Sequence, residues 1–187
     1  MVPIMSLWLP ILISAVLVFV VSAVVHMVLP YHRSDFKQLP DEVGVMEAVR
    51  KSGAAPGDYM APYCRTPAEM KTPEFAERRM KGPVLIMTVI PGGPITMGKE
   101  LLQWFLFCVF VSVFAAYITG RALASGTEYL QVFRFAGTTA FAAYAIGTIP
   151  TSIWYKRQWS TTMKDLFDGL VYACATAGVF GWLWPGR

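Results

Sequence analysis

Residues 101–123 read LLQWFLFCVFVSVFAAYITGRAL, an apolar run that is long enough to cross a lipid bilayer as one helix. The hydrocarbon core of a bilayer is about 30 Å thick, so a helix needs about 20 consecutive apolar residues to span it. Three further runs have this length, at residues 7–29, 132–154 and 166–184. The sequence therefore predicts an all-α integral membrane protein with a bundle of four transmembrane helices.

The composition agrees with this fold class. Hydrophobic residues make up 55% of the chain and charged residues 15%, and the mean hydropathy is +0.47. A soluble domain has about 25% charged residues. Most charged residues lie between Pro30 and Leu101, where acids and bases alternate, so the net charge of +4 forms no basic block. We therefore expect no nucleic-acid partner.

The first run is predicted to be retained as a transmembrane helix. Its leader, MVPIMS, has no Lys or Arg, and the run is longer than the apolar region of a usual signal peptide. Positive charge in short loops favours the cytoplasmic side. Lys156, Arg157 and Lys164 follow the third run, whereas Arg121 and Arg134 flank the turn before it. This pattern predicts a multi-pass protein of the bacterial inner membrane, with both termini outside and the polar segment cytoplasmic.

Small residues recur at four-residue steps in the second and fourth apolar runs and gather on one side of the first and third, which predicts one stripe of small residues on each helix. Such small-xxx-small stripes let helix backbones approach closely in lipid. The predicted packing residues are Ala15 and Ser22; Cys108, Ser112, Ala116 and Gly120; Ala136, Ala140, Ala143 and Gly147; and Gly169, Ala173, Ala177 and Gly181. Stripes of this kind predict a compact bundle with little room for a wide pore. Pro150, followed by Thr151 and Ser152, predicts a kink, or a loosened end, in the third helix.

The polar segment at residues 31–98 is too long for a plain loop, so we expect it to fold into a small, mostly helical cap between the first two transmembrane helices. Residues 40–53 have acids first, bases last and a terminal glycine, as helices prefer. Two Thr-Pro pairs, at Thr66 and Thr72, predict further helical starts. Residues 84–90 are rich in β-branched side chains and can form a strand or an interfacial segment, with residues 57–63 as its partner in a short β-hairpin.

The candidate polar pair within the membrane is His26 and Asp168, with Tyr172 one turn away from the aspartate. Both lie at the same predicted depth, and ionisable groups inside a span are rare and often functional. Such a pair can pass a proton, hold a ligand headgroup or only lock two helices together. The last of these roles is the commonest.

Other polar residues have plainer interpretations. Asp165 is predicted to complete a capping box with Thr162 at the start of the fourth helix. His32 lies beyond the apolar run and is expected to face solvent or lipid headgroups. Arg134 is expected to extend toward outer headgroups, with Tyr117 as an alternative partner.

No metal or cofactor is predicted. His26, Met27, His32 and Cys64 suggest copper, but histidines six residues apart cannot share one face of a helix. Soft-metal handling therefore remains an alternative without a matching ligand pattern. The three cysteines form no framework, and the chain lacks phosphate-binding, dinucleotide-binding and zinc-protease motifs.

Rich packing stripes without a catalytic constellation predict a non-catalytic protein, an accessory or scaffold subunit of a larger membrane protein complex. Its expected partners are membrane lipids and other membrane protein subunits or further copies of the chain. The alternative is a small transporter or proton-linked carrier that uses His26 and Asp168. A third hypothesis is a membrane enzyme that acts on lipid with His26 as base.

Overall fold

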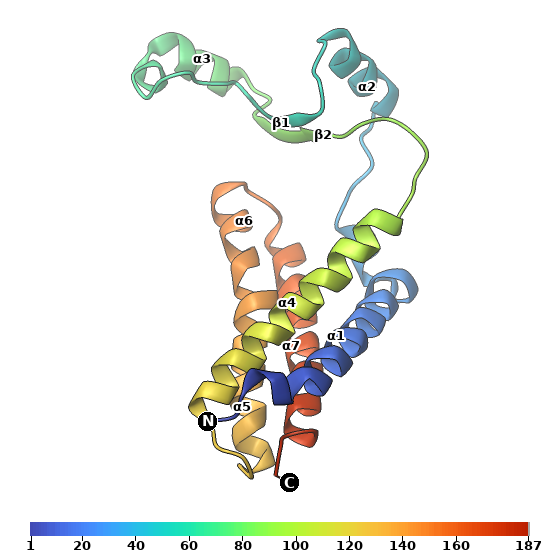
Figure 1. Cartoon of the computed structure of the whole chain (residues 1–187). Helices are drawn as coiled ribbons and strands as arrows, with labels where there is room; N and C mark the ends of the chain where they lie inside the picture. Colours follow the sequence, from blue (N-terminus) through green and yellow to red (C-terminus); the bar gives the residue numbers. More distant parts are fainter. Residues whose placement is uncertain (187) are drawn as a thin grey trace. The chain divides into compact units, whose positions relative to one another are not determined.

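A computed structural model describes residues Met1–Gly186 and is mostly helical (Figure 1). The chain divides into two compact units. One contains Met1–Phe36 and the chain from Thr96 onward, and the other is the insertion Lys37–Ile95. The apolar runs lie in the first unit and most of the charged residues lie in the second.

Three helical stretches are long and apolar enough to cross a membrane: Ile4–Val28, Gly98–Ala122 and Tyr129–Trp154. The first comprises the 3-10 turn η1 (Ile4–Leu7), α1 (Trp8–Ala23) and the π turn η2 (Val24–Val28). The second is α4 (Gly98–Ala122), and the third comprises α5 (Tyr129–Tyr144), η5 (Ile146–Thr148) and α6 (Ile149–Trp154). The last long helix is α7 (Trp159–Trp182). Helix α7 does not reach the same apolar threshold, and its first half carries Lys164, Asp165 and Asp168.

The long helices pack against one another in sequence around a closed ring. Helix α1 contacts α4, α4 contacts α5, α5 contacts α7, and α7 contacts α1. Of the predicted packing residues, those buried in the structure are Ala15, Ser22, Cys108, Ser112, Ala116, Gly120, Ala136, Ala140, Gly169, Ala173, Ala177 and Gly181. Small side chains therefore line the contacts between helices, as close packing in lipid requires.

Ala143 and Gly147 are exposed, so their predicted place on the packing stripe is wrong. The buried face of α5 continues from Ala140 by a full four-residue step to Tyr144, and the α-helix then ends. Ala145 takes over the contact with α7 and sits directly against Gly169, where an added Cβ would lie 2.6 Å from the Ala145 Cβ.

The third apolar stretch is interrupted near Pro150. Ala145 has φ −114° and ψ −55°, and a 3-10 turn separates it from α6, in which Pro150 occupies the first turn. Because proline has no N–H and clashes with the carbonyl four residues earlier, the helix before it is broken. Hydroxyl groups add hydrogen bonds at this interruption: Thr148 donates to the Ala145 oxygen at 2.8 Å and Thr151 to the Thr148 oxygen at 2.5 Å. The interruption is thus confirmed, although it begins five residues before the proline.

One end of the helical unit is fastened by its terminal segments. The Val2 amide donates to the Gly120 carbonyl at 2.7 Å. The Trp184 indole donates to the Ala124 carbonyl at 2.9 Å, and the Gly126 amide donates to the Pro185 carbonyl at 2.8 Å. The turn between α4 and α5 is therefore bonded to the residues that follow α7.

The insertion contains α2 (Glu42–Lys51), β1 (Gly57–Ala61), η4 (Glu69–Lys71), α3 (Pro73–Lys81) and β2 (Leu85–Val89). The strands pair antiparallel, with Gly57 opposite Val89 and Ala61 opposite Leu85, which confirms the predicted pairing. Asp41 caps α2 by accepting from the Gly44 amide at 2.9 Å, and Thr72 caps α3. Helices and a two-stranded sheet thus form this unit.

Candidate functional site

The end of the first helical stretch turns sharply back toward the bundle. The π turn η2 closes with the Leu29 amide donating to the Val24 carbonyl at 3.1 Å. Leu29 is extended, with φ −77° and ψ 134°, and Pro30 then opens the 3-10 turn η3 (Pro30–Ser34). Extended backbone before a proline and a proline at the first helical position are both favoured locally. This turn returns His32 to the level of His26.

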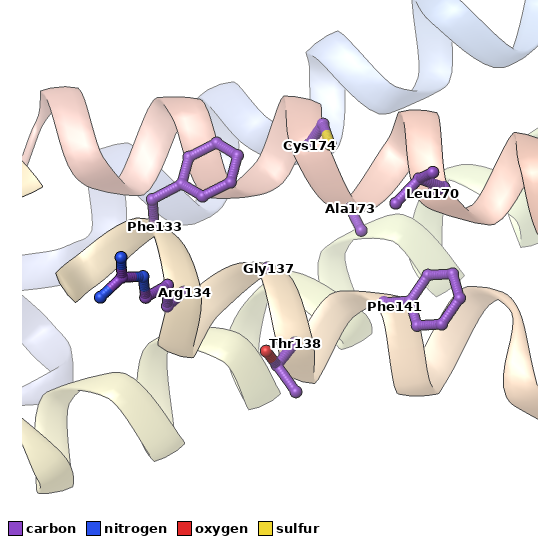
Figure 2. Close-up of a pocket in the computed structure, with 8 residues that line it drawn as sticks. All are labelled: Phe133, Arg134, Gly137, Thr138, Phe141, Leu170, Ala173 and Cys174. Carbon is purple, nitrogen blue, oxygen red and sulfur yellow. The ribbon is translucent and has the colours of Figure 1, made fainter. Parts of the chain in front are cut away.

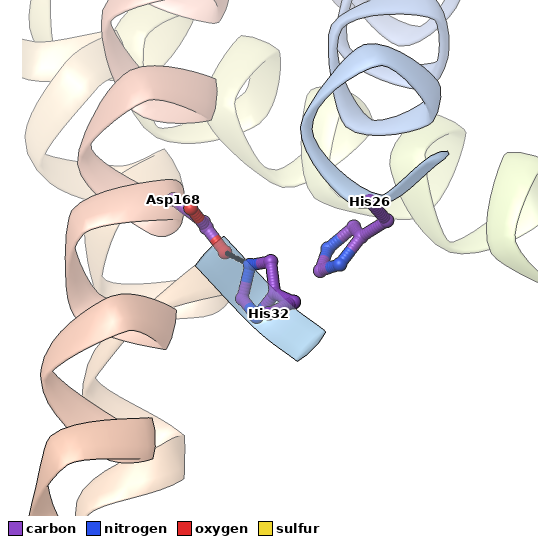
Figure 3. A group of neighbouring side chains, drawn as sticks. All are labelled: His26, His32 and Asp168. Carbon is purple, nitrogen blue, oxygen red and sulfur yellow. Dashed lines mark hydrogen bonds and ion pairs between the residues drawn. The ribbon is translucent and has the colours of Figure 1, made fainter. Parts of the chain in front are cut away.

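His32 lies between two carboxylates. Its Nε2 is 2.8 Å from the Asp168 Oδ2, and its Nδ1 is 2.7 Å from the Asp35 Oδ2. The Tyr31 hydroxyl donates to the other oxygen of Asp168, Oδ1. Asp168 comes from α7, so these bonds tie the turn after the first stretch to the last long helix (Figure 3).

His26 completes the cluster without bonding directly to Asp168. Its ring packs on that of His32, with centroids 4.4 Å apart and planes inclined by 32°. The ligand atoms of His26, His32 and Asp168 all lie within 4.8 Å of one another. Figure 3 shows the two imidazoles side by side, with His32 directed at Asp168.

Lys164 places a positive charge beside this cluster. Its Nζ donates to the Asp35 Oδ1 at 2.6 Å, the Tyr31 carbonyl at 2.6 Å and the Ser34 hydroxyl at 2.8 Å. Lys164 precedes Asp168 by four residues, so both point from the same face of α7. One face of α7 therefore binds the η3 turn through a cation and an anion.

Burial and hydrogen bonding set the protonation of the residues around the cluster. Burial alone would raise the pKa of the Asp35 carboxyl, but hydrogen bonds from Lys164 and His32 hold this pKa below its usual range. Burial, followed by the bond to Asp168, raises the pKa of the Tyr31 hydroxyl. At neutral pH, Asp35 is therefore an anion and Tyr31 a neutral donor.

The structure brings His26 and Asp168 to one cluster, but His32 lies between them. The expectation that His32 faces solvent or headgroups is wrong, because its side chain is only 12% exposed and is bonded on both ring nitrogens. Tyr172 is buried against Trp104 and Tyr144, and its hydroxyl has no partner among Met1–Gly186. The sequence reasoning also missed Tyr31, Asp35 and Lys164. The sequence signal for this contact is that Asp35 follows His32 by three residues in a turn that begins at Pro30.

The predicted capping role of Asp165 is also wrong. Helix α7 begins at Trp159, so Thr162 already lies inside the helix, where its hydroxyl contacts that of Ser152 at 2.5 Å. Asp165 accepts a hydrogen bond from Arg157 at 2.5 Å instead. The contact between the buried Ser152 and Thr162 hydroxyls joins α6 to the first turn of α7.

An open groove of about 350 Å³ borders the cluster between α1 and α4. It is lined by Phe19, Ser22, Ala23, His26, Met27, Met97, Leu101 and Trp104. Within it the Trp104 indole donates to the Ser22 hydroxyl at 2.7 Å. Of the lining side chains, only that of His26 has a titratable group, so the groove gives the cluster an apolar open side.

A second groove of about 310 Å³ lies between α5 and α7 (Figure 2). Arg134 is its one charged lining residue, beside Phe133, Gly137, Thr138, Phe141, Leu170, Ala173 and Cys174. Arg134 is exposed, as expected for a side chain that extends to headgroups. A single cation among apolar side chains supplies neither a nucleophile with its base nor a metal-ligand set.

Cys64 lies in the insertion, where its thiol contacts the Thr66 carbonyl at 2.8 Å. Cys108 is buried and Cys174 is exposed. None of the three lies in the cluster at His32. No protein-family model, curated protein or solved structure matches the chain.

Proposed function

We propose that the protein is a non-catalytic membrane protein that serves as an accessory or scaffold subunit of a larger membrane complex, with its insertion as the surface that binds a partner protein. One observation carries this proposal. Throughout Lys37–Ile95, all of which the structure describes, Phe75 is the only buried residue. A unit that buries so little has to gain stability from something that covers it.

The two-stranded sheet supports this proposal, because it leaves apolar side chains uncovered. Met60 lies opposite Ile86 on one face, and both side chains are exposed. Tyr59 lies opposite Met87 on the other face, where Leu85 is also exposed. A sheet of two strands is marginal in water by itself. Apolar side chains on both faces therefore favour an occupant that covers the sheet.

A protein suits this surface better than an anionic lipid surface. Acidic and basic residues are nearly balanced in the insertion and alternate along it, so it has no basic patch that would be drawn to lipid headgroups. Mixed charge around exposed apolar side chains is instead the usual composition of a protein interface.

We predict that a photo-crosslinking residue at Met60 or Ile86, expressed in native membranes, captures one partner polypeptide of defined mass. The same probe at Lys51, a solvent-facing position whose side chain is 81% exposed, serves as the control and should capture little. Ile86→Glu should weaken recovery of the partner in mild detergent by about tenfold, which corresponds to about 1.4 kcal/mol. Crosslinks to lipid alone, or only within the chain, would contradict the proposal.

We further propose that α7 spans the membrane as a fourth helix. It has 24 residues, enough to cross a bilayer, and it packs against both α1 and α5. Four of its polar residues, Thr161, Thr162, Asp168 and Thr176, are buried and face the protein rather than lipid. A helix that is enclosed by its neighbours can tolerate a lower hydropathy than one that faces acyl chains.

We predict which loops lie on each side of the membrane if the chain crosses it four times. In single-cysteine variants that lack the native cysteines, Thr127 and Gly186 should react with an impermeant maleimide on one side of the membrane, and Glu47 and Gln158 on the other. For the proposed orientation, Glu47 and Gln158 are labelled only after the inner membrane is permeabilised. If Gly186 and Gln158 react on the same side, α7 does not cross.

A proton-linked carrier is the second candidate, and one observation favours it. His26, His32, Asp168 and Tyr31 form a continuous set of titratable side chains beside an open groove. A carrier of this kind would lose proton-coupled flux in vesicles when Asp168 loses its charge. An accessory subunit would show no flux with either aspartate or asparagine at this position.

A further inference from the structure

The hydrogen bonding of His32 requires one more positive charge than a neutral imidazole supplies. A neutral ring has a single N–H. Yet both ring nitrogens of His32 face carboxylate oxygens, at 2.7 Å for Asp35 and 2.8 Å for Asp168. One of these contacts therefore needs a further proton or a metal ion between the nitrogen and the oxygen.

The surroundings of His32 resemble those of a metal-binding histidine. Metal-ligating imidazoles usually donate their second N–H to a carboxylate, which fixes the tautomer and orients the ring. Asp35 is placed to accept from Nδ1 and is itself held by Lys164 at 2.6 Å. Nε2 then carries a lone pair and faces the Asp168 Oδ2, while Tyr31 occupies Oδ1. His32 and Asp168 thus each have a supporting residue, and the free ring nitrogen of His32 faces the carboxylate oxygen that Tyr31 does not bind.

We propose that His26, His32 and Asp168 form a site for a divalent transition-metal ion of the class of Zn²⁺. Two imidazoles and a carboxylate are ligands that zinc prefers, with bonds of about 2.0–2.2 Å. Tetrahedral ligands at such bond lengths lie about 3.3 Å apart. The three ligand atoms already lie within 4.8 Å of one another, so small rotations of the side chains bring them to this spacing.

His26, one of the three ligands, also lines the groove between α1 and α4. A metal site with three protein ligands keeps an open position for water or another small ligand. Because the ligands come from the π turn, the η3 turn and α7, the ion clamps three segments at one end of the helical unit. This inference does not depend on the proposed role of the insertion.

Metal binding can be tested directly on the purified protein in detergent, with an affinity tag that contains no histidine. After treatment with a chelator, the protein is titrated with Zn²⁺ against a competing indicator, and bound metal is measured by elemental analysis. The wild type should bind one equivalent and melt at a higher temperature with zinc than without it. Co²⁺ should give the visible absorption bands of a four-coordinate site.

Variants identify the ligands. His26→Gln, at an exposed side chain, should leave the fold intact and weaken binding by about tenfold or more. Asp35→Asn should weaken it by about 10–100-fold, because the residue that supports His32 loses its negative charge. Cys64→Ser is the control, because a thiol in the insertion is the competing soft ligand, and it should bind as the wild type does. Failure of the wild type to take up zinc, or loss of binding in Cys64→Ser but not in His26→Gln, would overturn the proposal.

Discussion

Gly169→Ala should destabilise the folded protein by about 1–3 kcal/mol, the usual cost of overpacking a core. A Cβ at Gly169 would lie 2.6 Å from the Cβ of Ala145 and 3.0 Å from its Cα. Neither atom belongs to a flexible side chain, so α5 and α7 have to move apart. The loss is measured as a lower midpoint of unfolding in a denaturing-detergent titration, or as a lower melting temperature in mild detergent.

Gly178→Ala is the matched control on the same helix. There an added Cβ would meet only the Tyr129 hydroxyl, at an ordinary contact distance of 3.6 Å. Because alanine favours helix by about 1 kcal/mol over glycine, this variant should be neutral or slightly more stable. Equal stability of the two variants would show that the close contact between α5 and α7 does not constrain the fold.

Asp168→Ala should be more damaging, with a loss of about 3–5 kcal/mol, since it removes one partner of a buried charged network. Asp168 is 3% exposed, and its loss leaves the Tyr31 hydroxyl without its acceptor and removes the contact at the His32 Nε2. Asp168→Asn keeps an acceptor oxygen but no charge, so it should cost about 1–3 kcal/mol. The same unfolding measurement gives both values.

Asp165→Asn provides the comparison one turn earlier on α7. Asp165 pairs with Arg157, whose side chain is 41% exposed, so this substitution should cost less than about 1 kcal/mol. If Asp165→Asn and Asp168→Asn lower stability equally, the network at Asp168 contributes no more than a surface ion pair. The Asp168→Asn protein in vesicles also separates the two candidate functions, since only a carrier has a flux to lose.

Spacing predicted the buried residues wherever the helix is continuous. The four-residue steps from Cys108 to Gly120 and from Gly169 to Gly181 lie in unbroken helices, and every residue on them is buried. The prediction failed at Ala143 because it lies three residues after Ala140, whereas the buried face of α5 continues by four residues to Tyr144. It failed at Gly147 because the interruption near Pro150 ends the helix several residues before the proline, which a count of residues cannot reveal.

The candidate site was only partly predictable. The position of each residue within its apolar run was enough to predict that His26 and Asp168 lie at the same level. The position of His32 depends on two things. The first is the chain reversal at Leu29 and Pro30, and the second is the contact with a carboxylate of α7, Asp168. The first of these is a local preference, whereas the second is a tertiary contact between residues more than a hundred positions apart. Local sequence signals do not carry the second kind of information.

Two interruptions of regular helix lie near the same end of the helical unit. The π turn at Val24–Val28 and the break after Tyr144 both lie toward the end that holds Asp168, while the Trp184 and Val2 bonds clasp the other. Local opening is easiest where regular hydrogen bonding is interrupted. Local opening of the helices is therefore expected first at the end that holds the two imidazoles, and last at the end that the terminal segments fasten.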